Sequence, residues 1–435
     1  MKKIVQYLDN YSLKKGLLYD FSSGIFKNQD LFIEKGKLSF QCEKENNLTN
    51  HINIEGCVVL PAFVDLRMHL NLPGTGGVEN LEMTLSRATR GGYSNVLLMP
   101  NTAPMIDSPA SARLIQERAK SINGVEVLVA GCLTVQSKGE ALSPMGSLKE
   151  AGICAVTDCP KSPQNNKIFI NAVKYAKMFD LPVIEYPVTF DLHENTSAHE
   201  SLQSIKMGLR GEPRISEELS VHRAIAVSRK ENAKIHISSI STSSSVDLVR
   251  KAKDEGIRIT ADVTANHLLF NEDAINQFDT NAKMQPYLKE EHDRQSLIDG
   301  IIDGTIDAIT SAHEAWPIHL KGVEFDRAPA GSMGLETAFH ASYLALSEKV
   351  KNPIPLLVDK FAIQPRKILG LELPQLKNNK ICSFNVISTG QKWVFCKDSA
   401  INGNTINSPV FNSEFTTSIK LSCINGKTYS DVLKN

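Results

Sequence analysis

The chain has 435 residues, of which 42% are apolar and 22% are charged, and its 48 basic residues balance 48 acidic ones. This length suits a large barrel with an appended domain, and the even charge gives no reason to expect nucleic acid or an anionic membrane as a partner. The sequence contains no run of about 18 apolar residues and no signal-peptide core, so it predicts no transmembrane helix. Its eight cysteines include no Cys-x-x-Cys pair, which predicts reduced thiols and a cytoplasmic protein.

Short β-like runs separated by Gly and Asn turns occupy the first 57 residues. Leu31–Ile33 is one of these runs, and the Asn-rich segment Asn46–Asn53 has the composition of a loop. Nothing in this part is long enough to bury a core by itself. We therefore expect these runs to pair with strands from elsewhere in the chain.

Eight apolar runs alternate with amphipathic stretches through the middle of the chain, and their Val, Ile and Leu content is typical of strands buried on both faces of a parallel sheet. The runs are Val58–Asp65, Asn95–Met99, Val125–Ala130, Cys154–Thr157, Pro182–Glu185, Lys234–Ser238, Arg258–Val263 and Asp307–Thr310. The helical stretches between them include Ser108–Ser121, Asn165–Phe179, Ser216–Glu231, Ser243–Glu255 and Glu290–Asp303. This alternation predicts an α/β fold of the (β/α)₈ TIM-barrel type.

The end of the chain, residues 372–435, again shows short β-like runs, such as Trp393–Phe395. We predict that residues 1–57 and 372–435 together form one small β-sandwich domain, beside a barrel built from residues 58–371. Within the barrel, Asp191–Arg214 has the composition of a loop.

Several motifs, which follow one another along nearly the whole chain, resemble those of dihydroorotases, a branch of the cyclic amidohydrolases. They are Pro61-Ala62-Phe63-Val64-Asp65 followed by His69, Met99-Pro100-Asn101-Thr102, His267-Leu268-Leu269, Asp279-Thr280-Asn281 followed by Lys283, and Gly334-Leu335-Glu336-Thr337. The resemblance implies an amidohydrolase barrel with a split β-domain, and hydrolysis of the cyclic amide dihydroorotate in pyrimidine synthesis. It also implies one or two Zn²⁺ ions that lower the pKa of a water and polarise the amide carbonyl.

The resemblance further implies where metal ligands should lie, at the carboxyl ends of the strands. The first histidine of the family's His-x-His motif matches Arg67, whose guanidinium repels a metal, and the second matches His69. The strand-4 carboxylate matches Asp158 to within one residue. The strand-5 histidine, the strand-6 histidine and the strand-8 aspartate, which is also the general base, match Tyr186, Ser239 and Ala312.

The substrate contacts that the family implies are altered as well. The arginine for the substrate carboxylate matches Asn71, whereas the asparagine of the Met-Pro-Asn-Thr motif is kept as Asn101. The remaining matches replace an asparagine, a histidine and a Phe-Gly pair by Gln285, Trp316 and Ala330-Gly331. Scaffold motifs therefore persist where reactive groups are absent.

These replacements predict a site that cannot activate water. Removal of a general base typically costs a factor of about 10² to 10⁴, and loss of the metal removes the activated water as well. We therefore expect no intact catalytic residue, no bound cofactor, and only His69 and Asp158 still able to act as ligands. An ion pair between Arg67 and Asp158 is expected in the place of the metal.

Other reactive residues near the strand ends have structural interpretations. His236, His267 and His313 with Glu185 could rebuild a metal site, but none of these pairs has the His-x-His spacing. The sequence favours a structural role for His236, which lies inside a strand. Cys159 is expected to be inert, and Glu314 to be a solvated loop carboxylate. None of these reactive residues therefore changes the prediction of a site that cannot activate water. They are Cys159, Glu185, His236, His267, His313 and Glu314.

Three functional hypotheses follow. The favoured one is a non-catalytic dihydroorotase homologue that acts as an assembly partner, as homo-oligomer or with a second protein, because some homologues without metal ligands serve as partners of aspartate carbamoyltransferase. The second is an active, zinc-dependent dihydroorotase or related cyclic amidohydrolase with a site rearranged around His69, Asp158 and His313. The third is a protein that binds a small molecule at the barrel mouth, around Asn101 and Arg67.

Overall fold

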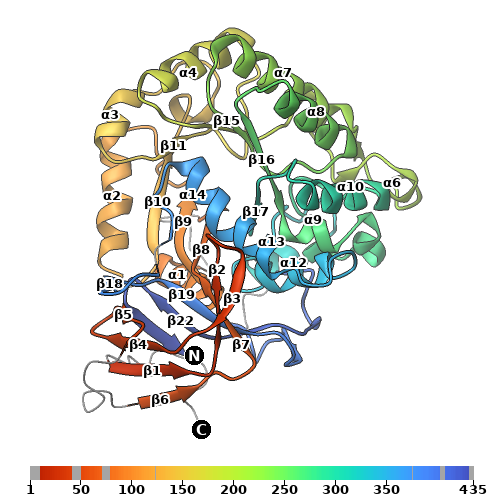
Figure 1. Cartoon of the computed structure of the whole chain (residues 1–435). Helices are drawn as coiled ribbons and strands as arrows, with labels where there is room; N and C mark the ends of the chain where they lie inside the picture. Colours follow the sequence, from red (N-terminus) through yellow and green to blue (C-terminus); the bar gives the residue numbers. More distant parts are fainter. Residues whose placement is uncertain are drawn as a thin grey trace.

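The structure is a computed structural model, and it describes residues 10–41, 50–70, 79–122, 124–374, 376–401 and 407–430. Figure 1 shows central strands surrounded by helices, with strands from the two ends of the chain (red and blue) gathered together below them. The molecule therefore consists of a barrel and a sheet-rich domain built from both chain ends, as the sequence predicts.

Eight parallel strands form the barrel and follow one another in the order of the chain. They are β8 (Phe63–Met68), β9 (Tyr93–Leu98), β10 (Glu126–Gly131), β11 (Ala155–Val156), β12 (Val183–Glu185), β15 (Ile235–Ile237), β16 (Ile259–Thr264) and β17 (Ala308–Thr310). A bridge between Met68 and His313 brings the first strand beside the residues that follow the last, and the His69 N–H donates to the His313 carbonyl at 2.9 Å. The barrel is thus nearly closed at the carboxyl ends of its strands, where the site is predicted.

The helices of the barrel cover the outside of these strands (Figure 1). Every one of the five predicted helical stretches agrees with a helix to within one residue at each end. Ser108, for example, accepts a hydrogen bond from the Ser111 N–H and so caps the helix that Pro109 begins. The main helices are α1 (Leu81–Arg90), α2 (Pro109–Lys120), α3 (Met145–Glu150), α4 (Asn166–Met178), α7 (Ile215–Glu231), α8 (Ser243–Asp254), α10 (Glu291–Ile302), α12 (Ala338–Leu346), α13 (Ile354–Val358) and α14 (Gln364–Leu369).

Two packed sheets form the second domain. The first has the order β18-β5-β4-β1-β6 and the second the order β23-β22-β19-β7-β2-β3. Tyr11 and Leu31 of the first sheet share one buried cluster with Val59, Phe384 and Leu421 of the second, so the sheets pack face to face as a sandwich. Their strands are β1 (Asn10–Lys14), β2 (Leu17–Asp20), β3 (Ile25–Asn28), β4 (Leu31–Glu34), β5 (Lys37–Ser39), β6 (Asn50–Asn53), β7 (Cys57–Pro61), β18 (Lys380–Ile381), β19 (Phe384–Ser388), β22 (Ser418–Ile424) and β23 (Lys427–Ser430).

The predicted strand Val58–Asp65 is in fact two strands. β7 pairs with β19 and β2 in the sandwich, whereas β8 pairs with β9 in the barrel. Ala62 lies between them: its N–H donates to the Ser383 carbonyl at 3.1 Å, and its carbonyl accepts from Arg366 Nη1 at 3.1 Å. Both strands are buried on both faces, so the apolar pattern of the sequence shows no break.

Two segments that have the composition of loops contain short regular elements. Asp191–Arg214 holds most of α5 (Phe190–His193), together with β13 (Ala198–His199), α6 (Leu202–Lys206) and β14 (Gly211–Glu212), and β13 pairs with β14. Asn50–Asn53 forms β6, which pairs in parallel with β1, whereas Asn46 lies outside the described residues. None of the described helices is long and apolar enough to cross a bilayer.

Candidate functional site

Arg67, near the end of β8, lies inside the barrel mouth with 1% of its surface exposed. Its Nε–H donates to His69 Nε2 at 3.0 Å, and its Nη1 donates to Ser239 Oγ at 3.0 Å and to the Gln285 carbonyl at 3.2 Å. The guanidinium carbon lies 4.7 Å from the centroid of the Tyr186 ring. One cation therefore contacts three of the predicted metal-ligand positions, namely His69, Tyr186 and Ser239.

His69 is held as a neutral imidazole. An arginine can only donate, so Nε2 of His69 must accept the bond from Arg67, and the ring proton is assigned to Nδ1, 2.8 Å from Asn101 Oδ1. Burial, together with the charge of Arg67, lowers the pKa of His69 to about 3. The lone pair that could bind a metal is thus occupied by a hydrogen bond from a cation.

A buried carboxylate, Asp262 in β16, anchors the serine that Arg67 contacts. Asp262 Oδ1 accepts from the Ser239 N–H at 2.7 Å and from Ser239 Oγ at 3.3 Å, and Oδ2 lies 2.8 Å from His236 Nε2. Arg67, Ser239 and Asp262 therefore form a chain of hydrogen bonds, in which the Ser239 hydroxyl lies between the guanidinium and the carboxylate. The predicted site residues mostly lie at strand ends, whereas Asp262 lies within a strand; a charged residue inside an apolar run is the signal that points to it.

The predicted ion pair between Arg67 and Asp158 is wrong. The Thr134 N–H donates to Asp158 Oδ1 at 3.0 Å, and the Thr134 hydroxyl donates to Oδ2. Cys159 is the neighbour that lies close to the Arg67 charge: burial raises the pKa of its thiol to about 11, and Arg67 opposes this rise. Asp158 and Cys159 follow the end of β11 and have different partners, so a one-residue difference in alignment decides which of the two is expected near Arg67.

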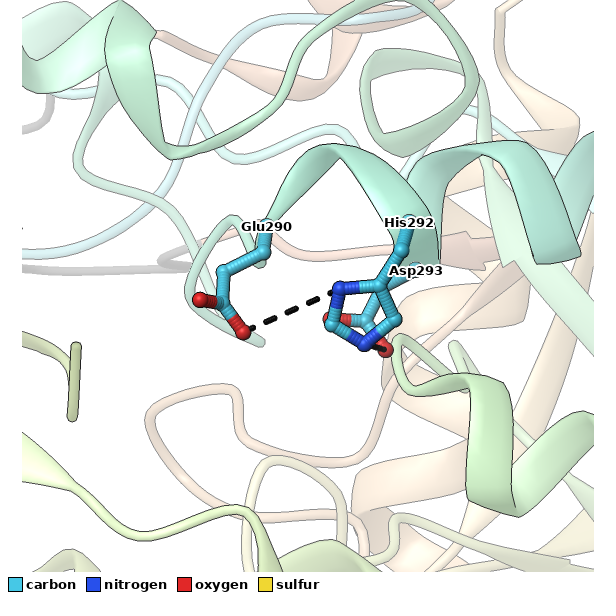
Figure 2. A group of neighbouring side chains, drawn as sticks. All are labelled: Glu290, His292 and Asp293. Atoms are coloured by element: carbon cyan, nitrogen blue, oxygen red, sulfur yellow. Dashed lines mark ion pairs between the residues drawn. The ribbon is translucent and has the colours of Figure 1, made fainter.

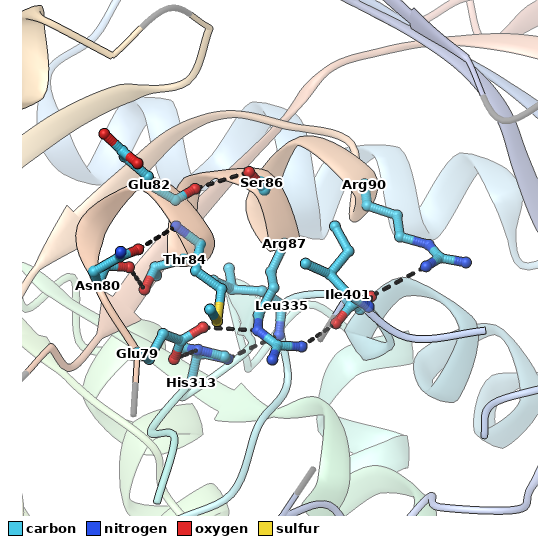
Figure 3. A network of polar contacts seen from close by, with 12 residues as sticks. Glu79, Asn80, Glu82, Thr84, Ser86, Arg87, Arg90, His313, Leu335 and Ile401 are labelled. Carbon is cyan, nitrogen blue, oxygen red and sulfur yellow. Dashed lines mark hydrogen bonds and ion pairs between the residues drawn. The ribbon is translucent and has the colours of Figure 1, made fainter. Parts of the chain in front are cut away.

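Ala312 and His313 follow β17, the last barrel strand, and neither residue is available for the predicted metal. Ala312 has no atom that can bind a metal or take a proton, and its φ of 46° is left-handed. His313 accepts at Nδ1 from the Gly334 N–H at 3.3 Å, and its Nε2 lies 2.9 Å from Glu79 Oε2 (Figure 3). Both ring nitrogens of His313 are therefore engaged by groups outside the predicted metal positions.

Glu79 belongs to a buried charge network that Figure 3 shows at the start of α1. Arg87 donates through Nε to Glu79 Oε1 at 2.7 Å and through Nη1 to Glu336. The Ile401 N–H donates to Glu336 Oε1 at 3.0 Å. Although burial opposes it, the neighbouring His313 and Arg87 lower the pKa of Glu79. This network joins α1 to the residues that follow β17.

Glu314 is half-buried, so it is less solvated than the sequence predicts. Burial raises the pKa of its carboxyl group to about 7, although the charge of Arg67 opposes the rise. Gly331 has a φ of 128°, and a Cβ there would lie 2.7 Å from Glu314 Oε2 and 2.8 Å from Trp316 Nε1. Trp316 Nε1 donates to the Ala330 carbonyl at 2.9 Å. Glycine at position 331 therefore lets the chain pass close to Glu314 and Trp316.

The predicted substrate-contact positions fall into two groups. Asn101 and Gln285 adjoin Arg67 and His69, and the Gln285 side-chain nitrogen lies 3.0 Å from His193 Nε2. Trp316, Ala330 and Gly331 form the second group, beside Glu314. Asn71 lies outside the described residues.

The four groups that could rebuild a metal site have separate partners. Glu185 accepts from Arg223 Nη2 at 2.5 Å, and His236 is held by Asp262. His267 Nδ1 lies 2.6 Å from the Thr264 hydroxyl, and burial lowers its pKa to about 3. His313 is engaged by Glu79, as described above, so these groups do not converge on one point.

A different cluster, Glu290, His292 and Asp293 at the start of α10, has ligand atoms that all lie within 4.8 Å of one another (Figure 2). Arg214 already occupies it, because Nη2 donates to Glu290 Oε2 at 2.7 Å and Nη1 to Asp293 Oδ1 at 2.5 Å. The Ser243 N–H donates to the same Asp293 oxygen at 2.8 Å. The cluster therefore joins the starts of the helices α7, α8 and α10, and we assign no metal to it.

The residues at the predicted zinc positions do not fit a zinc ion. Coulomb's law gives about 8 kcal/mol of repulsion between a divalent ion and a unit charge about 4 Å away at an effective dielectric constant of about 20, and Arg67 is in direct contact with His69. Burial raises the pKa of Tyr186 above its usual range, which keeps the phenol neutral. Ser239 and Ala312 supply no imidazole or carboxylate.

Comparison with known proteins identifies relatives of this chain in sequence and in fold. The family model described as Dihydro-orotase-like matches residues 56–245. A dihydroorotase of Pelobacter propionicus is 34% identical over 410 residues, which cover 93% of this chain and 96% of the relative. A dihydroorotase of Citrifermentans bemidjiense is 35% identical over 389 residues, which cover 88% and 91%. Among solved structures, the L-hydantoinase (dihydropyrimidinase) of Arthrobacter aurescens has a TM-score of 0.83 at 15% identity and covers 97% of this chain and 96% of its own.

The structural likeness defines the class of fold, an amidohydrolase-type barrel with a β-domain made from both chain ends. The sequence relatives are more specific, because they exceed 30% identity over most of both chains. The chain belongs to the dihydroorotase family.

Proposed function

We propose that this chain is a non-catalytic member of the dihydroorotase family that acts in pyrimidine biosynthesis as a structural partner. The observation that carries the proposal is the hydrogen bond from Arg67 Nε to His69 Nε2. It places a permanent cation against the one histidine that remains at the predicted ligand positions. The general base is absent too, because Ala312 stands at its position.

Analysis of bound zinc and of turnover tests this proposal. The purified chain is incubated with excess Zn²⁺, desalted and analysed for metal. Both the hydrolysis of dihydroorotate and the reverse ring closure are then measured. We expect less than one zinc ion per chain at the barrel mouth. We also expect no dihydroorotate turnover above that in buffer alone, because the site has neither an activated water nor a base.

The variant His69→Ala is the matched control for zinc bound elsewhere. Zinc held by surface groups stays in this variant, whereas zinc held at the mouth is lost. Stoichiometric zinc that disappears with His69→Ala, together with dihydroorotate turnover, would overturn the proposal in favour of an active metal-dependent enzyme.

The partner is proposed from the family resemblance, which links metal-free homologues to aspartate carbamoyltransferase. The experiment is sedimentation velocity of the chain alone and mixed with the aspartate carbamoyltransferase of the same organism. A faster species that contains both proteins is expected. Sedimentation of the mixture as the sum of its components would exclude this partner and leave assembly of the chain with itself, which the first sample measures.

A further inference from the structure

Two buried thiols lie side by side in the β-sandwich. Cys382 precedes β19 and Cys423 lies in β22, and their Sγ atoms are 3.6 Å apart. Their exposed fractions are 1% and 0%, and both belong to the core cluster between the two sheets. The thiols are thus in van der Waals contact, and Cys382 Sγ has a backbone neighbour as well, the Gly36 carbonyl at 3.5 Å.

The surroundings of the two thiols differ, which gives the pair a direction. A hydrogen bond from Cys382, and further ones from Thr428 and Tyr11, lower the pKa of Cys423, although burial opposes this change. The contact with Cys423 raises the pKa of Cys382, and burial adds to that rise. Cys423 is therefore the first of the pair to become a thiolate, which is the nucleophilic form of the group.

We propose that Cys382 and Cys423 are an oxidation site that forms a disulfide when the protein meets a small hydroperoxide. The Cys423 thiolate attacks one oxygen of hydrogen peroxide, which gives a sulfenic acid and a hydroxide that takes up the Cys423 proton as water. Cys382 sulfur then attacks the sulfenic sulfur, forms the S–S bond and releases a second water. In sum, two thiols lose two electrons and two protons, and one peroxide is reduced to two waters.

The position of this pair explains what oxidation would do to the fold. Cys423 lies in β22, which pairs with β19 and β23, and Cys382 lies between β18 and β19. The Gly426 N–H donates to the Cys382 carbonyl at 2.9 Å, so the two segments are already joined on both sides of the thiols. A covalent bond here closes the loop from 382 to 423 and restrains the β-sandwich against unfolding.

Peptide mapping after oxidation tests the proposal on the full chain. The protein is treated with hydrogen peroxide, in buffer and in urea below its unfolding transition, then alkylated under denaturing conditions. We expect a cross-linked peptide pair that contains Cys382 and Cys423, lighter by about 2 Da than the two reduced peptides. Cys396, a partly exposed thiol whose pKa is lowered by hydrogen bonds from Ser399, shows within each sample that the oxidant has acted.

Two variants separate the pair from the other thiols. Cys57→Ala removes a third thiol of the same core cluster and is expected to keep the cross-link. Cys382→Ala is expected to lose it and to leave Cys423 as a sulfenic acid that dimedone traps. Oxidised wild-type protein is expected to melt about 2–5 °C higher than reduced protein, and oxidised Cys382→Ala is not. Oxidation of Cys396 with Cys382 and Cys423 still recovered as free thiols in both buffers would overturn the proposal.

Discussion

Two buried arginines at the barrel mouth have opposite surroundings. Arg87 is fully buried between two carboxylates, Glu79 and Glu336. Arg67 is equally buried but donates to neutral groups, among them His69 and Ser239. The first arginine is paired as buried charges usually are, whereas the second keeps its positive charge largely uncompensated by direct contacts.

This difference indicates what each arginine does. Arg87 joins α1 to the residues after β17 (Figure 3), and together with Arg90, which lies 3.4 Å from Glu336, it balances the charge of the two carboxylates. Arg67 brings a fixed positive charge to the region in which family members are expected to bind zinc, and the carboxylate of Asp262 reaches it only through Ser239. A guanidinium in contact with the predicted ligand positions repels a metal ion, so Arg67 is the arginine that bears on function.

The largest expected effect separates the two arginines by their contribution to folding. Arg87→Met leaves two buried carboxylates without their cation and is expected to lower the free energy of unfolding by about 3–5 kcal/mol. Arg67→Met leaves only neutral acceptors without a donor and is expected to cost about 1–2 kcal/mol. Urea unfolding of both variants measures the difference. Equal losses would show that Arg67 is as strongly compensated as Arg87.

The next effect concerns Glu314 and depends on pH. Its folded pKa of about 7 exceeds the ordinary value of 4.5, so stability from its protonated form is complete below pH 4.5 and is lost as the pH rises through 7. Glu314→Gln, which mimics the protonated form, is expected to stabilise the protein by about 1–3 kcal/mol at pH 8 and by little at pH 4.5. Unfolding curves at the two pH values measure this. Destabilisation at pH 8 would show instead that ionised Glu314 compensates Arg67.

A smaller effect on stability is expected from the backbone conformation of Ala312, just after β17. Ala312 has a φ of 46°, so Ala312→Gly is expected to raise the free energy of unfolding by about 1 kcal/mol. Ala308→Gly, within β17, is the matched control and is expected to lower it by about 0.5–1 kcal/mol. Thermal melting of both variants measures the two effects. A loss of stability in Ala312→Gly would show that the alanine methyl contributes packing that outweighs the strain.

The smallest expected effect is the absence of a gain. Arg67→His restores the His-x-His motif and removes the cation, but Tyr186, Ser239 and Ala312 still supply neither the other ligands nor the base. We expect no dihydroorotate turnover from this variant in an assay in which an active dihydroorotase serves as the positive control. Measurable turnover would mean that the remaining ligands are assigned to the wrong residues.

The sequence predicts well what depends on periodicity. The alternation of apolar runs and amphipathic stretches indicates the barrel, and the convergence of parallel strands then brings Arg67, Tyr186 and Ser239 together although they are far apart in the chain. A capping residue such as Ser108 fixes a helix start from local chemistry alone.

The sequence does not predict what depends on the direction of a single side chain. Asp158 and Cys159 are neighbours, and only the structure shows that Asp158 is directed at Thr134. Glu314 is half-buried and lies close to Gly331, which is 17 residues further along the chain and comes near it only in the fold. Tertiary contacts of this kind leave no periodic signal, because one residue on each side is enough to make them.

The joint at Ala62 has a mechanical consequence. Ala62 alone separates β7 of the sandwich from β8, the first strand of the barrel. Its N–H is hydrogen-bonded to Ser383 and its carbonyl to Arg366. A hinge requires free backbone torsions, and this residue has its two backbone polar groups held from opposite sides. A protein that binds the sandwich would therefore fix the orientation of the barrel as well, and the two domains would tumble in solution as one rigid body.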